Sequence, residues 1–333
     1  MSRITIRDIA KLLNVSPSTV SRALKDHPDI GAATKKKINQ VAEDLGYQPN
    51  YQAIHFRQRK SKLIGLILPD INRFFYPDLV KAIEEITKKK GYNLIIFQSN
   101  ELLEREKECV ALCQNFGIEG LLVSLTAETT SLTHFNSLIQ NGIPIVLVDK
   151  IIKEVDNAIV TIDDFTAAFN AVQHLAKKKY HKISGVFANK NLTITKQRKA
   201  GFKAALKKYQ LPYFEKFCFH NTSKMDTKEQ FKQLLNQDKR PDAVFLMTDE
   251  LLSEVIQVIY ETGLKIPQDI AIISISNGYL PYYLHPKVTH IKHSGYQVGE
   301  VAVNLLVDMI EHPTRVQKTQ IELETYLVEM DSC

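Results

Sequence analysis

Two polar side chains one helical turn apart, Ser18 and Arg22, could read the edges of base pairs in DNA. An arginine can donate two hydrogen bonds to guanine, and a serine hydroxyl can donate or accept at a base edge. Pro17, beside them, can add only an apolar contact. Such chemistry requires a short helix that exposes these residues near its N-terminal end, as in a helix-turn-helix domain.

The preceding residues predict a first helix between Thr5 and Asn14. Thr5 suits the N-cap, with Asp8 three residues further on, and Asn14 can end the helix in a left-handed conformation. Three apolar residues at helical spacing predict one buried face: Ile9, Leu12 and Leu13.

Ser16 and Pro17 suit the N-cap and first position of a second helix, where the missing proline N–H costs nothing. Its inward side is predicted to hold Val20, Ala23 and Leu24. This leaves Pro17, Ser18, Ser21 and Arg22 exposed. A small helical hairpin without a DNA role could share this pattern, so the charge distribution decides between the two interpretations.

The positive charge of the chain is confined to its N-terminal segment. Residues 1–60 hold 11 Lys and Arg against 5 Asp and Glu, whereas the other 273 residues hold 32 of each kind. Neutralising phosphates supplies most of the sequence-independent affinity for DNA, so this asymmetry favours the DNA-binding interpretation.

A third helix is predicted with Thr34 as its N-cap and Gly46 as its stop. Its apolar positions would close a small helical core: Ile38, Val41, Ala42 and Leu45. The run of lysines at 35–37 fits phosphate contact and plain solubility equally well. Residues 1–48 are therefore predicted to be an all-α helix-turn-helix domain, followed at 49–61 by a basic linker too short and polar to hold a helix alone.

The segments 5–22, 45–50 and 63–72 resemble the LacI/GalR family of bacterial transcription regulators, and the similarity runs from residue 3 to the C-terminus. The resemblance implies that the linker is a hinge, which forms a short helix in the minor groove of operator DNA. It implies these DNA-binding residues: Thr5, Ser16, Pro17, Ser18, Thr19, Ser21, Arg22, Thr34, Tyr47, Asn50, Ala53, Phe56 and Arg57.

Phe56 departs from the family at the position of the apolar side chain that is wedged between central base pairs. Most relatives have Leu there, so a flat ring puts the usual central C-G step of the operator in doubt. Ala53 matches the small residue that lets the backbone approach the groove. In the alternative interpretation, Phe56 only packs against its neighbours in the free protein.

Beyond residue 62, apolar runs alternate with stretches of helical periodicity such as 78–90, which predicts parallel sheets with crossover helices. The predicted strands are 63–68, 92–98, 120–124, 145–149, 158–162, 183–187, 217–220, 243–247 and 271–274. About 270 residues favour two lobes. The resemblance implies an α/β two-lobed periplasmic-binding-protein-like domain over 62–333, with one lobe at 62–162 and 292–323 and the other at 163–291 and 324–333.

Two such lobes leave a cleft at their sheet edges, where open α/β proteins bind small ligands. By residue-by-residue comparison, the resemblance implies effector contacts from Phe75, Tyr76, Ser124, Asp149, Arg198, Asp249, Ser276 and Asn277. Aromatic residues after a strand are otherwise usually core, and Asp249 could be only a helix cap.

Ser276 stands where relatives commonly have a carboxylate that holds sugar hydroxyls or a purine. A neutral hydroxyl accepts fewer and weaker hydrogen bonds than a carboxylate. Because the cleft keeps Arg198 and loses one negative charge here, one hypothesis is a ligand with an acidic group or with fewer paired hydroxyls.

The sequence gives no support to a metal site, a cofactor or an enzyme. Cys109 and Cys113 lack Cys or His partners at short spacing, so we expect them to pack in the core, and His290 and His293 to belong to a strand. No nucleotide-binding, hydrolase or zinc-protease motif occurs. No signal peptide or membrane span is visible, which favours a cytoplasmic, nucleoid-associated bacterial protein over a secreted solute receptor.

The sequence thus predicts a ligand-responsive, sequence-specific repressor. The resemblance implies a homodimer on a pseudo-palindromic, double-stranded operator, and a sugar or sugar derivative as effector. Whether the effector releases or tightens DNA binding is left open, because the family contains both behaviours. No Leu-heptad helix follows Glu329, which favours a dimer over a tetramer built through such a segment.

Arg22→Ala is expected to cost about 1–3 kcal/mol at the operator and to relax base preference, because the guanidinium reads a base edge. Lys36→Ala, the control, should weaken all sequences alike if that lysine touches phosphate. Fluorescence anisotropy with operator variants measures both effects. Unchanged base preference in Arg22→Ala would refute the base-reading role.

Overall fold

The computed structural model describes residues 4–47, 61–152, 157–221, 224–237, 239–313 and 319–333. Its internal contacts divide the chain into two units, 1–61 and 62–333. None of the helices within these ranges has the length and apolar character needed to cross a membrane.

The first unit is a bundle of α1 (Ile6–Leu13), α2 (Pro17–Leu24) and α3 (Ala32–Asp44). Its small core consists of Ile9, Ala10, Val20, Ala23, Ile38 and Ala42. The predicted ends of the first two helices are confirmed. Asp8 accepts hydrogen bonds from the Thr5 N–H and hydroxyl, Asn14 is left-handed with φ of +50°, and the Ser16 hydroxyl accepts the Thr19 N–H at 3.1 Å.

The predicted inner face of α1 is wrong at Leu12, which is 64% exposed, whereas Ala10 is buried with Ile9. Successive helical residues turn by about 100°, so the face centred between Ile9 and Ala10 includes Leu13 but leaves Leu12 at its margin. The centre of the buried face of α1 is set by packing against the other helices, and the spacing of its apolar residues alone does not show it.

The predicted cap of α3 is also wrong, since the N-cap is Gly31 and Thr34 is the third helical residue. Ala32 and Ala33 are strong helix formers, so the helix begins before the threonine that resembled a cap. Its end agrees with the prediction, because Gly46 follows the last turn with φ of +60°.

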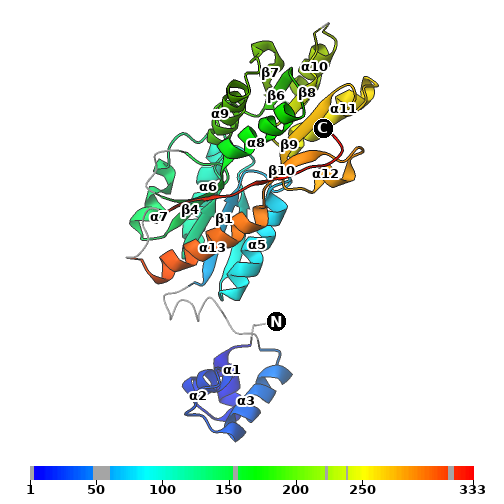
Figure 1. The fold of residues 1–333 in the computed structure, drawn as a ribbon. Helices are drawn as coiled ribbons and strands as arrows, with labels where there is room; N and C mark the ends of the chain where they lie inside the picture. The colour runs from blue at the N-terminus through cyan, green and yellow to red at the C-terminus, as the bar shows by residue number, and fades with distance from the viewer. Residues whose placement is uncertain (1–3, 48–60, 153–156, 222–223, 238, 314–318) are drawn as a thin grey trace. The chain divides into compact units, whose positions relative to one another are not determined.

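The second unit begins with a six-stranded sheet in the order β11-β5-β4-β3-β1-β2, all parallel (Figure 1). The strands are β1 (Leu63–Leu68), β2 (Asn93–Gln98), β3 (Gly120–Val123), β4 (Ile145–Val148), β5 (Ala158–Ile162) and β11 (Gln320–Leu323). Helices α5 (Tyr76–Lys89) and α13 (Gly295–Glu311) pack against one face. Helices α6 (Leu103–Phe116) and α7 (Asn136–Gln140) cover the other, with the short turn η1 (Thr133–Phe135).

A second six-stranded sheet has the order β12-β10-β9-β8-β6-β7. Its strands are β6 (Ile183–Phe187), β7 (Cys218–His220), β8 (Ala243–Leu246), β9 (Ala271–Ser276), β10 (Thr289–Lys292) and β12 (Tyr326–Val328), of which β12 is antiparallel to β10. Its helices are α8 (Asp164–Lys177), α9 (Thr193–Lys208), α10 (Lys224–Leu235), α11 (Asp249–Glu261), α12 (Leu280–Tyr283) and the turn η2 (Glu215–Phe217). Each predicted strand segment overlaps an observed strand. Strand β9 extends two residues beyond its predicted end, to Ser276.

The chain passes between the two lobes three times, after β5, after β10 and after β11. Residues that follow strands of both sheets therefore meet in the middle of the unit. Cys109 and Cys113 belong to α6, and their side chains face the core. Burial raises the pKa of both thiols, to about 12 for Cys113. This supports packing as their role.

Helices α8 and α9 approach each other closely at Gly201. A Cβ added there would lie 2.1 Å from the carbonyl oxygen of Phe165 and 3.1 Å from the backbone nitrogen of Phe169. These are main-chain atoms, which cannot rotate away as a side chain can. Only glycine allows this approach.

Gly201→Ala is expected to lower the free energy of unfolding by about 1–3 kcal/mol, because the methyl group must push the two helices apart. In an uncrowded helix the same substitution stabilises, so the sign itself is informative. Urea unfolding of the variant measures the change. Lys207→Ala, on the exposed side of α9, should stay within about 0.5 kcal/mol of wild type. A stabilised Gly201→Ala variant would contradict the tight packing.

Candidate functional site

The N-terminal end of α2 presents an exposed polar surface. Pro17, Ser18 and Arg22 are exposed, while Ser21 is half-buried, so the prediction that all four face solvent holds only in part. The Ser16 hydroxyl lies 2.7 Å from that of Ser18. Ser18 and Arg22 therefore remain the side chains of this helix that a base edge could reach.

Arg22 lies 3.9 Å from Asp29, and both side chains are largely exposed. An ion pair of this kind contributes little and is readily exchanged for a phosphate or a base. Thr19 is half-buried, Thr34 is exposed on α3, and Tyr47 packs against the helical core. The predicted hinge residues Asn50, Ala53, Phe56 and Arg57 lie outside the described residues.

In the second unit, a cavity of about 90 Å³ lies between the two lobes. Five of the predicted effector residues line it: Phe75, Tyr76, Asp149, Arg198 and Asp249. Ser124, Ser276 and Asn277 do not line it and instead contact residues that do. An outer cavity of about 760 Å³ shares Arg73, Phe74, Lys150 and Glu250 with the inner one.

Tyr76 links Ser124 and Asp149 inside the first lobe by hydrogen bonds. It is 1% exposed, and its hydroxyl donates to Asp149 Oδ2 at 2.8 Å and shares a 2.9 Å hydrogen bond with Ser124. Asp149 follows β4 with φ of +58°, a backbone conformation that non-glycine residues keep only when their surroundings hold it. Tyr76, which is itself bonded to Ser124, thus holds the carboxylate of Asp149 in place. Phe75 is half-buried and lines the cavity.

Asp249 is the first residue of α11 rather than its cap, because the Thr248 hydroxyl accepts the Leu251 N–H at 3.4 Å. The interpretation of Asp249 as only a helix cap is therefore wrong. Its Oδ2 accepts the Asn277 N–H at 3.3 Å, whereas its Oδ1 is buried and has no hydrogen-bond partner. The neighbouring Ser276 hydroxyl acts to lower the pKa of this carboxyl group, against the larger effect of burial.

Arg198 is 4% exposed, and its charge is already paired within the protein. Its Nε lies 2.8 Å from Asp164 Oδ1, and its Nη1 donates to the carbonyl oxygen of Met247. The hypothesis of an acidic ligand rested on Arg198 together with the loss of one negative charge at Ser276. Because Arg198 is paired with Asp164, its charge gives less support to an acidic group, while the alternative of fewer paired hydroxyls is unaffected.

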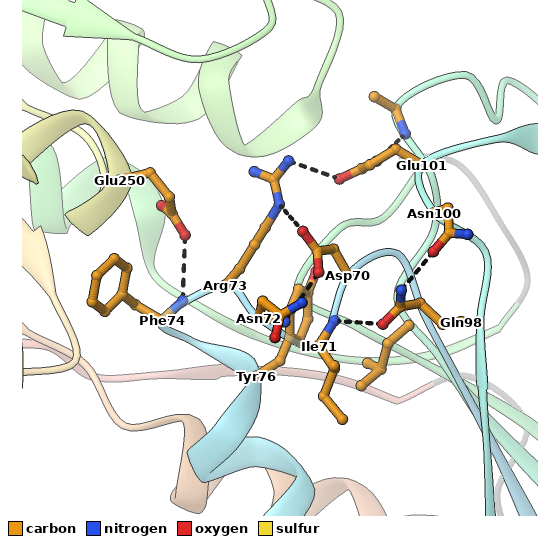
Figure 2. Close-up of polar contacts among 12 residues, drawn as sticks. Asp70, Ile71, Asn72, Arg73, Phe74, Tyr76, Gln98, Asn100, Glu101 and Glu250 are labelled. Carbon is orange, nitrogen blue, oxygen red and sulfur yellow. Dashed lines mark hydrogen bonds and ion pairs between the residues drawn. The ribbon is translucent and has the colours of Figure 1, made fainter. Parts of the chain in front are cut away.

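The loop after β1 joins the two lobes (Figure 2). The Phe74 N–H donates to Glu250 Oε1 at 3.3 Å, and the Phe74 carbonyl accepts from Asn277 Nδ2 at 2.7 Å. Next to it, Arg73 Nη2 lies 3.4 Å from Glu101. The backbone of a first-lobe residue is thus held by two side chains of the second lobe.

Burial changes the titration of the groups around this cavity. It raises the pKa of Asp249 to about 7 and that of Asp164 to about 6, the latter against the opposing effect of Arg198. Burial also raises the pKa of Asp149. It lowers the pKa of His293 to about 3, so this imidazole is neutral at physiological pH. The described residues contain no cluster of three or more His, Cys, Asp or Glu suited to a metal ion.

Two family models match this chain. One, described as bacterial regulatory proteins of the lacI family, matches residues 5–50, and the other, a periplasmic binding protein-like domain, matches residues 172–333. Catabolite control protein A of Priestia megaterium is 31% identical over 313 residues, which cover 93% of this chain and 94% of the relative. The chain belongs to the lacI family.

A second lacI-family relative, the NTD biosynthesis operon regulator NtdR of Bacillus subtilis, is 29% identical and covers 98% of this chain and 99% of its own. The lac repressor dimer bound to operator and the anti-inducer ONPF matches with a TM-score of 0.88 at 20% identity, covering 99% of each chain. The CelR–cellobiose complex matches with a TM-score of 0.75 at 20% identity, covering 99% of this chain and all of the other. The predicted family and fold class are confirmed.

Several residues that line the cavity were not predicted as effector contacts, among them Phe74, Asp164 and His293. Asp164 follows Asp163 at the start of α8, where either aspartate resembles a helix cap, and only the contact with Arg198 distinguishes them. His293 follows β10 and was assigned to a strand. Phe74 precedes the better-matched pair Phe75 and Tyr76.

Asp249→Asn is expected to raise the melting temperature relative to wild type at pH 8, and to raise it clearly less at pH 5. An unfolded aspartate ionises near pH 3.8 and the folded Asp249 near 7. Wild-type stability therefore falls as the pH rises between these values, and the asparagine removes that loss. Asp331→Asn, an exposed control, should show no such pH dependence. The same difference at both pH values would contradict the raised pKa.

Proposed function

We propose that this lacI-family protein is a sequence-specific transcriptional repressor whose operator affinity changes when a small metabolite binds between its lobes. The observation that carries the proposal is the match of one chain to both a DNA-binding family model at its N-terminus and a two-lobed ligand-binding fold behind it. The exposed Ser18 and Arg22 would read bases, with phosphate contacts from the basic segment.

Ligand binding would act through the contacts between the lobes. Phe74 of the first lobe is held by Glu250 and Asn277 of the second, and a ligand in the adjacent cavity would change how firmly they are held. Residues 49–61 lead directly into β1, so a shift of the first lobe would move the predicted hinge. The difference in ligand affinity between the two lobe arrangements sets the upper limit of the change in DNA affinity that the ligand can cause.

We further propose that the repressor binds DNA as a homodimer, as the lac repressor does in its operator complex. Three exposed tyrosines lie close together in the sequence of the second lobe, Tyr279, Tyr282 and Tyr283, and the rings of Tyr279 and Tyr283 are 5.0 Å apart. Surfaces of this kind mark protein contacts. The protein would work in the cytoplasm, where its operator lies, and we assign it no catalytic role and no cofactor.

Selection of bound fragments from random DNA by the full chain tests the proposal. We expect an enriched pseudo-palindrome, protected symmetrically in footprinting, with affinity that falls steeply as salt rises. Sedimentation should show a dimer on the selected site. A metabolite that raises the melting temperature should also shift affinity for that site. Binding without sequence preference would contradict the proposal, as would turnover of a bound metabolite.

A further inference from the structure

We propose that the effector carries a protonated amine and that the carboxylate of Asp249 binds it. This inference rests on the proposed function, because it assigns a chemical class to the ligand of the same cleft. It replaces the acidic ligand that the sequence suggested. Three features of the described residues support it: an unpaired carboxylate oxygen, a surplus of negative charge, and aromatic rings beside that charge.

The unpaired oxygen is Oδ1 of Asp249. Asp249 is 5% exposed and lines the cavity, yet this oxygen accepts no hydrogen bond from any described residue. A buried acceptor left without a donor costs about 1–3 kcal/mol, and more when it is charged. A hydrogen-bond donor on the ligand would therefore remove the energetic cost of leaving this oxygen unpaired.

The cations of the inner cavity already have carboxylate partners. Arg198 pairs with Asp164, and both Arg73 and Lys150 pair with Glu101, which lies in the outer cavity. Glu101 is thus shared by two cations. Among the described residues no ion pair joins these cations to Asp249, although the nearby charge of Arg198 lowers the pKa of Asp249.

Three of the four acidic side chains that line the inner cavity have only neutral donors. Asp149 accepts from the Tyr76 hydroxyl, Glu250 from the Phe74 N–H, and Asp249 from the Asn277 N–H. The fourth, Asp164, is the partner of Arg198. The outer cavity adds Asp70, Glu101 and Glu254 but only one further cation, Lys228, so the two linings together hold more carboxylates than cations. A cationic group would lower the energy of this cleft, whereas an anionic one would raise it.

The rings at the cavity suit an ammonium group as well. Phe74 and Phe75 are half-buried and line it together with Tyr76. Aromatic faces attract cations most strongly where water is excluded. His293, 5.4 Å from the ring of Phe75, is held neutral by burial and adds no repelling charge. Carboxylate and aromatic groups together distinguish an amine from a plain hydroxyl, which gains less from both.

Three probes of nearly equal size test the inference: ethanolammonium, ethylene glycol and glycolate, which present an ammonium, a hydroxyl and a carboxylate. Titration calorimetry at pH 8 and constant ionic strength should show ethanolammonium binding about tenfold or more tightly than ethylene glycol, because its hydrogen bond is charge-assisted. Glycolate should not bind. D-Glucosamine should likewise bind more tightly than D-glucose. Equal or weaker binding of the amine in both comparisons, or no binding by either amine, would overturn the proposal.

Asp249→Asn keeps the size of the side chain and removes its charge, so it should abolish the preference of the protein for ethanolammonium. Asp331→Asn, exposed and remote from the cavity lining, should retain it. If the asparagine variant does not fold, the wild-type pH profile replaces it: affinity for ethanolammonium should increase from pH 6 to pH 8 as the carboxylate ionises, while that for ethylene glycol should not. An unchanged amine preference in Asp249→Asn, or a flat pH profile, would overturn the assignment to Asp249.

Operator binding separates failure of this inference from failure of the proposed function. A protein that binds a pseudo-palindrome selectively but prefers a neutral or acidic effector would refute the amine alone. A protein without sequence preference for DNA would refute the repressor, whatever its cleft binds. The two measurements use the same full-length chain.

Discussion

The three passages of the chain between the two lobes are the constraint on which the rest of the second unit depends. Each passage follows a strand, so the strand ends of both sheets are tied to one region. That region contains the cavity and the contacts of Phe74 with Glu250 and Asn277. Three covalent connections leave rotation about a hinge as the simplest motion of one lobe against the other.

Burial of carboxylates in this region gives the cleft its chemical character. Asp149, Asp164 and Asp249 are all removed from water, and their pKa values rise as a consequence. Arg198 compensates one of them, Asp164, within the protein. Ionising these buried carboxyl groups thus costs free energy. A ligand that stabilises the ionised carboxylates would bind preferentially to the lobe arrangement in which they are buried. This is the differential affinity that an allosteric effector needs.

The DNA-binding unit depends on a different kind of interaction, because its helices are short and its core is small. Thr5 with Asp8, Asn14, and Ser16 with Pro17 fix the ends of α1 and α2, and the capping contacts are all local in the sequence. Local hydrogen bonds of this kind hold Ser18 and Arg22 at the start of a defined helix. The exposed end of α2 is therefore defined by local capping contacts, whereas the cleft between the lobes is defined by contacts between residues far apart in the sequence.

The sequence by itself determined the caps of α1 and α2, the alternation of strands and helices, and the family, because these follow from neighbours along the chain or from a specific motif. It misplaced Leu12 and the start of α3, since the burial of a helix face depends on what packs against it. It named Arg198 and Asp249 but could not show that one is paired and the other is left with an unpaired oxygen. The partner of Arg198 is 34 residues away in the sequence, and Asn277 lies 28 residues from Asp249. Only the tertiary structure brings such groups together and removes them from water, and so only it decides which charges of the cleft remain for a ligand.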